Sequence, residues 1–177
     1  MHKCFFKLFV LSYVFVGCAV KVPVPDVQNV KQLSTLLQFL HPRVTKKEAN
    51  ELSKDIFHKT ATLVQTFKLT SPPQFHNFLV NIGLRKKGLC YDWSDALYVH
   101  LILQEYRDFE FHLMGAHIGE YWREHNALLV IAKGRRVEDG IIIDPWRNSG
   151  KLYFSKLKDD NVYEWKHRAD RGCQSKR

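Results

Sequence analysis

Residues 87–103 read KGLCYDWSDALYVHLIL. The part from Leu97 to Leu103 contains no Asp, Glu, Lys or Arg. We therefore predict a helix over residues 94–106 that is buried in the middle of the domain. Cys90 comes just before this helix. Cysteine nucleophiles are often found at such a helix start, because free backbone N–H groups and the helix dipole stabilise a thiolate there.

The chain changes its pattern after this helix and becomes typical of β-strands. Residues 109–114 alternate between apolar and polar, and residues 127–132 form a continuous apolar run. Two more short strands are predicted at 140–144 and 150–154. Because helices come first and short-linked strands follow, we predict an α+β fold in which the buried central helix packs on an antiparallel sheet.

The region before Cys90 is predicted to be helical. One helix is expected from Val30 to Leu40, and a second from a capping box at Thr45 to about Lys68. A short third helix is expected after the prolines at 72 and 73. The predicted inward face of the second helix carries Leu52, Ile56, Leu63, Val64 and Phe67. We predict a single domain over 28–177, with a helical part (28–82), a core (83–157) and a basic tail (158–177).

Two polar residues stand at the ends of apolar strands. His125 opens the run HNALLVI, and Asp144 closes the run IIID. A histidine can take a proton from a thiol and return it to a leaving group, and a carboxylate can hold the imidazole in the required tautomer. The sequence therefore predicts that Cys90, His125 and Asp144 form a catalytic triad.

Three segments together resemble the core of the transglutaminase-like superfamily, a group of papain-related cysteine enzymes that includes bacterial peptidases. They are GLC at 88–90, HNALLV at 125–130 and IIDPW at 142–146. The resemblance covers roughly residues 83–147, and it implies Cys90 as nucleophile, His125 as base and Asp144 as the orienting residue. One departure is that Tyr91 and Asp92 separate the cysteine from an aromatic residue that often follows it directly.

The resemblance also implies an oxyanion hole and a substrate groove. The backbone N–H of Cys90 is one expected donor. The second donor usually comes from an upstream side chain, for which Gln74, Asn77 and Asn81 are candidates. Trp93 and Trp146 are candidates to line the groove, with core packing as the alternative for both.

No metal or other cofactor is predicted. His112 and His117 are the histidines considered as zinc ligands together with Cys90 or His125, but their spacing matches no zinc motif.

These features predict a cysteine hydrolase that cleaves an amide or peptide bond through a thioester on Cys90, with a protein or peptide as substrate. Several alternatives stay open. An amine that resolves the thioester would make the protein an acyltransferase, and a peptidoglycan amidase uses related chemistry. A catalytically inactive protein could use the same fold to bind a partner.

The first residues have the pattern of a secretory signal peptide, predicted over 1–17. A basic start precedes an apolar run at 8–16, and Gly17 and Cys18 follow. The sequence VGC resembles a bacterial lipobox, which implies lipidation of Cys18 and a membrane anchor. Residues 18–27 contain two prolines and are predicted to form an extended tether. We expect an exported protein, as an outer-membrane lipoprotein facing the periplasm or otherwise in secreted form.

The composition adds two expectations. The net charge is +9, or +7 without the two lysines of the predicted signal peptide, which favours anionic surroundings. No nucleic-acid-binding motif is present, so no nucleic-acid partner is predicted. After removal of the signal peptide and lipidation of Cys18, Cys90 and Cys173 are the remaining thiols. A disulfide between them is the structural alternative to a reactive Cys90.

Overall fold

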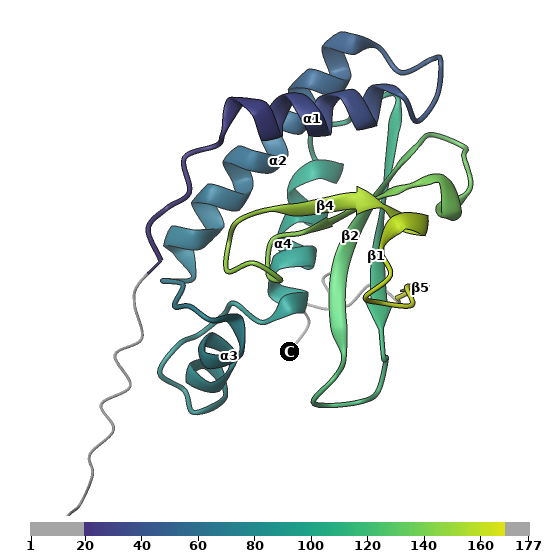
Figure 1. Ribbon diagram of the computed structural model, residues 1–177. Helices are drawn as coiled ribbons and strands as arrows, with labels where there is room; N and C mark the ends of the chain where they lie inside the picture. The colour runs from purple at the N-terminus through teal and green to yellow at the C-terminus, as the bar shows by residue number, and fades with distance from the viewer. Residues whose placement is uncertain (1–19, 169–177) are drawn as a thin grey trace, which may run out of the picture.

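The computed structural model describes residues 20–168 (Figure 1). The predicted signal peptide, the lipidation site Cys18 and the second thiol Cys173 lie outside these residues. The helices are α1 (Val27–Gln38), α2 (Lys46–Thr66), α3 (Pro73–Asn81) and α4 (Cys90–Ile102). The strands are β1 (Phe109–Ala116), β2 (His125–Ala132), β3 (Ile141–Asp144), β4 (Tyr153–Lys156) and β5 (Lys166–His167). Two short 3-10 helices, at Val137–Asp139 and Leu157–Asp159, lie between strands.

The strands form one antiparallel sheet in the order β4-β3-β2-β1-β5. β2 is the central strand and is buried along its whole length. This explains its continuous apolar sequence, since a strand covered on both faces needs no polar side. The predicted α+β class, with helices before an antiparallel sheet, is confirmed.

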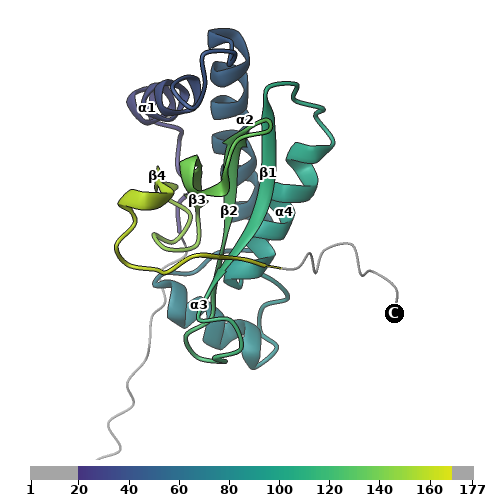
Figure 2. The same cartoon turned by 90° about the vertical axis from the view of Figure 1, so that its right-hand side faces the viewer.

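The two faces of the sheet have different cover. Side chains alternate between faces along a strand. Leu128 and Val130 point into the main core, which also contains Leu97 and Leu101 of α4. The neighbouring positions of β2 belong to a smaller apolar cluster, and this cluster packs against Leu157, Trp165 and other residues outside the helices α1–α4. Figure 2 shows the chain that leads to the C-terminus, in yellow, crossing β2 and β1. The sheet thus lies between α4 and this segment.

α4 begins at Cys90, four residues before the predicted start. The Asp92 carboxylate accepts hydrogen bonds from the backbone N–H groups of Gly88 (2.8 Å) and Leu89 (3.0 Å), and these bonds fix the turn into the helix. The expectation of a fully buried helix was wrong. Val99 and Ile102 are about two-fifths exposed, because α2 and the sheet cover only one side of α4.

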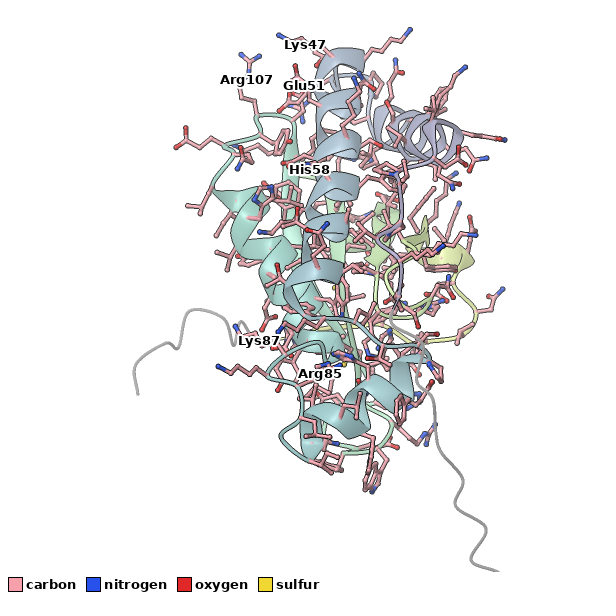
Figure 3. The ribbon with its side chains drawn as sticks, turned by 90° about the vertical axis from the view of Figure 1, so that its left-hand side faces the viewer. Lys47, Glu51, His58, Arg85, Lys87 and Arg107 are labelled. Atoms are coloured by element: carbon pink, nitrogen blue, oxygen red, sulfur yellow. The ribbon has the colours of Figure 1, made fainter. Side chains whose placement is uncertain are left out.

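α2 confirms the predicted inward face, whose five apolar residues are all buried. Its opposite side carries charged side chains, including Lys47 and Glu51 (Figure 3). The capping box is half formed. The Thr45 hydroxyl accepts the Glu48 N–H at 3.2 Å, but the Glu48 carboxylate binds the backbone N–H groups of Arg107 and Asp108 instead. Glu48 thereby ties the start of α2 to the loop before β1.

Within residues 20–168, no helix combines the length and the apolar composition needed to cross a membrane.

Candidate active site

Cys90 is the first residue of α4 and is 8% exposed. It is a free thiol, and its S–H points to the backbone carbonyl of Glu124 at an S···O distance of 3.8 Å. Glu124 directly precedes β2. The fold therefore places the sulfur at the start of the central strand, where His125 begins.

His125 and Asp144 meet on adjacent strands. β2 and β3 pair with Leu128 opposite Ile143, so Asp144 falls opposite position 127 and diagonal to His125 on the same face. The distance from His125 Nε2 to Asp144 Oδ2 is 2.7 Å, and both side chains are buried. Since a carboxylate only accepts, Nε2 donates this hydrogen bond. The predicted contact between the two residues is confirmed.

The electrostatic environment of His125 links it to Cys90 as well. Burial lowers the pKa of His125, but the hydrogen bond to Asp144 and the interaction with the Cys90 thiol outweigh burial and raise the pKa to about 9. Nε2 is bonded to Asp144, so Nδ1 is the nitrogen available to the sulfur. Nδ1 is buried and has no partner of strict hydrogen-bond geometry among the described residues. The contact between Nδ1 and the Cys90 sulfur is thus looser than a hydrogen bond.

Asp144 has a second partner that the sequence did not indicate. Arg147 donates to it from Nε (2.9 Å) and from its backbone N–H (3.1 Å). The same guanidinium forms a two-pronged ion pair with Asp160, at 2.7 and 3.2 Å. Burial raises the pKa of Asp160, but its bonds to Arg147 and other donors outweigh burial and hold the pKa below its usual value. His125, Asp144, Arg147 and Asp160 therefore form one continuous chain of polar contacts.

Three aromatic rings enclose the imidazole of His125. Ring centroids lie at 4.5 Å for Tyr163, 4.8 Å for Trp146 and 5.5 Å for Trp165. Tyr163 and Trp165 belong to residues 158–168, which were predicted as part of a basic tail. That prediction missed their role, because this segment packs over the site and ends in β5. His125 is consequently only 2% exposed.

Asn126 is a further residue that the sequence interpretation missed. Its Nδ2 donates to the Cys90 sulfur at 3.5 Å and to Glu124 Oε1 at 3.3 Å. The side chain is buried. Consecutive residues of β2 thus both interact with the sulfur, through an imidazole and an amide.

The structure brings one of the three predicted oxyanion donors to the site. Asn77, on α3, accepts a hydrogen bond from Trp146 Nε1 on its Oδ1 at 3.0 Å. Trp146 in turn contacts His125, so Asn77 lies at the edge of the site. Gln74 and Asn81 are exposed, and none of their side-chain contacts reaches the triad.

The two groove candidates differ. Trp93 is fully buried, packs edge-on against Phe67 with ring centroids 5.0 Å apart, and donates from Nε1 to the Gly88 carbonyl. Its assignment to a substrate groove was wrong, because it points into the main core from the inner side of α4. Trp146 lies against His125 and stays a candidate.

Other histidines and cavities lie apart from the triad. His112 neighbours His167, and His117 neighbours Glu120. Across residues 20–168, no group of three His, Cys, Asp or Glu is arranged to hold a metal ion. A cavity of about 530 Å³ is lined by the N-terminal segment, by α2 and by residues 148–152, and none of its lining residues belongs to the triad.

No known family model, curated protein or solved structure matches this chain. The resemblance to the transglutaminase-like superfamily therefore depends on the quoted segments and on the geometry described above.

Proposed function

We propose that this protein is a cysteine hydrolase of the transglutaminase-like type, which cleaves an amide or peptide bond through a thioester on Cys90. One observation carries the proposal: a thiol at a helix start interacts with a buried histidine, whose other ring nitrogen is 2.7 Å from a buried carboxylate. Together these residues supply the nucleophile, base and orienting group of cysteine catalysis. The packing of α4 on an antiparallel sheet is also compatible with this proposal at the level of the α+β class.

The reaction follows from these positions. His125 takes the thiol proton, Cys90 Sγ bonds to the substrate carbonyl carbon, and the carbonyl electron pair moves to oxygen. When that pair returns, the C–N bond breaks and the imidazolium gives its proton to the leaving amine. Water then attacks the thioester while His125 accepts its proton. The C–S bond breaks, the sulfur regains a proton, and a carboxylic acid leaves.

The enclosure of His125 supports this chemistry. The raised pKa of about 9 favours the protonated imidazole, which is the form that gives a proton to the leaving amine. The three rings exclude water, which strengthens the attraction between the imidazolium and Asp144. Arg147 keeps the Asp144 carboxylate in place and is itself held by Asp160. We propose the same exported location and peptide or protein substrate that the sequence predicts.

The tight enclosure also favours one alternative. Cys90 and His125 are together almost completely covered, which suits a binding protein that no longer admits a substrate. The two functions differ in the reactivity of the thiol, because a structural cysteine has no reason to react faster than an ordinary one.

Iodoacetamide labelling at neutral pH tests the proposal. Cys90 should react faster than Cys173, which serves as an internal reference thiol, with each site followed by mass spectrometry of its peptide. The fast phase should be absent from Cys90→Ala. Equal labelling of the variant and the parent protein would contradict the proposed function and leave the binding role.

A further inference from the structure

Asn126 touches the reacting sulfur although the proposed triad does not use it. On the basis of the proposed function, we propose that the Asn126 side-chain amide is the second donor of the oxyanion hole and acts together with the backbone N–H of Cys90. The sequence pointed to upstream residues for this role, whereas Asn126 follows the catalytic histidine in the same strand.

The position of the amide supports the assignment. Asn126 shares a face of β2 with Leu128 and Val130, which pack toward α4, whereas His125 leaves from the opposite face. Nδ2 lies 3.5 Å from the Cys90 sulfur. When the sulfur carries an acyl group, a single carbon atom separates the acyl oxygen from the sulfur. A donor that now touches the sulfur is therefore within reach of the developing oxyanion.

The orientation of the amide is determined by Glu124. The Glu124 carboxylate accepts from Asn126 Nδ2 on Oε1 and from the Gly119 N–H on Oε2. A flipped amide would place its oxygen against this carboxylate. Nδ2 therefore faces the sulfur side with one hydrogen for Glu124 and one for the reacting group.

The burial of the Asn126 side chain destabilises the fold, and packing gives no reason for it. Its Oδ1 is buried and has no hydrogen-bond partner among the described residues. Every residue from 127 to 132 in β2 is apolar, so an apolar residue at 126 would continue the strand without this cost. An amide that stabilises charge in a water-excluded site gives a physical reason for a polar residue here.

The backbone N–H of Cys90 completes the pair. As the first residue of α4, Cys90 has an N–H with no acceptor inside the helix. Asn77 is the competing side chain. Its Oδ1 is bonded to Trp146, and no contact of Asn77 with the sulfur is present, whereas Asn126 already has one.

Two reagents separate an oxyanion donor from other roles. p-Nitrophenyl acetate acylates a thiol through a tetrahedral oxyanion, whereas iodoacetamide reacts at a saturated carbon and builds none. In Asn126→Ala, the acylation rate constant at Cys90 should fall about 100-fold while alkylation stays within about threefold of the parent. Asn81→Ala, which removes an exposed asparagine on α3, is the control, and it should leave both rates within about threefold.

The outcomes are distinct. An equal fall of both rates would show that Asn126 acts on the thiol alone, and no fall would show a packing role; either result overturns the inference. Circular dichroism and urea unfolding check that the variant is folded, and Asn126→Ser provides a smaller polar replacement if it is not. If the parent is acylated no faster at Cys90 than at Cys173, the proposed function itself fails, and the inference fails with it.

Discussion

Asp144→Asn removes the negative charge between His125 and Arg147 while keeping the size of the side chain. Arg147 loses its ion pair with Asp144 but keeps both of its bonds to Asp160. The main electrostatic consequence should therefore fall on His125. We expect its pKa to drop below 6.5, since burial continues to disfavour the imidazolium once the carboxylate is gone.

The magnitude follows from the pKa of His125. The rise from 6.5 in the unfolded chain to about 9 in the folded protein corresponds to about 3 kcal/mol of folding free energy. Because the folded pKa is the higher one, this stabilisation is fully present below pH 6.5. It is lost as the pH rises through about 9.

Urea unfolding of the parent and of Asp144→Asn, at several pH values between 6 and 9.5, measures this effect. The parent should lose about 3 kcal/mol more than the variant over this range. Other titrating groups are common to the two proteins, so the difference isolates His125. NMR titration of the His125 ring gives the two pKa values directly. Parallel stability curves, with the same His125 pKa in both proteins, would refute the proposed electrostatic link.

Two more substitutions test the supports of the site. Asp160→Asn should cost about 1.5–3 kcal/mol, because the Arg147 guanidinium loses its two charged hydrogen bonds to Asp160 and keeps its ion pair with Asp144. A red-shifted tryptophan emission should report the release of Trp165, whose Nε1 is bonded to Asp160. The pKa of Asp160 is lowered by folding, so parent and variant should converge in stability as the pH falls through the folded pKa, and a constant difference at acidic pH would contradict this. Gly88→Ala should cost more than Gly134→Ala, for which about 1–2 kcal/mol is expected from backbone strain alone. Both glycines have positive φ, so the backbone strain is common to the two variants. A Cβ at residue 88 would lie 2.2 Å from His76 Nε2, whereas a Cβ at residue 134 would meet no atom within 4 Å. Equal losses of unfolding free energy in urea would show that His76 does not hold the loop before Cys90.

The predictions from local pattern succeeded where local pattern determines structure. β2 is continuously apolar from Ala127 to Ala132 because both of its faces are covered, and it begins at His125, the polar residue that the sequence marked. The end of β3 at Asp144 follows from Pro145, which cannot donate to a sheet. Because β2 and β3 are neighbours, the two polar ends had to meet.

The error at Trp93 came from the position of the helix start. With a start at residue 94, Trp93 lies before the helix and can face a groove. With the observed start at Cys90, Trp93, Leu97 and Leu101 are four residues apart and share the inner face. The spacing was visible in the sequence, and it would have placed Trp93 in the core.

The cover over His125 could not be predicted in this way. Tyr163 and Trp165 alternate with Glu164 and Lys166, but this alternation is short and does not indicate that the segment packs over His125. Their position depends on contacts between residues far apart in sequence. Asp160 binds Arg147, and Arg168 binds Asp95 on α4 and the Leu113 carbonyl on β1.

These same contacts hold residues 160–168 in place over His125, so this segment is a fixed part of the site. Both ends of the segment are held by ion pairs of carboxylates with arginines, and the Arg168 side chain is almost fully buried. Opening the segment would separate both ion pairs, which is costly. A substrate of the proposed hydrolase would therefore approach Cys90 from elsewhere. In Figures 1 and 2, α3 and the turn between β1 and β2 lie at the same end of the molecule as the start of α4. Phe78 on α3 and Trp122 in the turn are exposed there, and they offer apolar contacts to a peptide that approaches from that end.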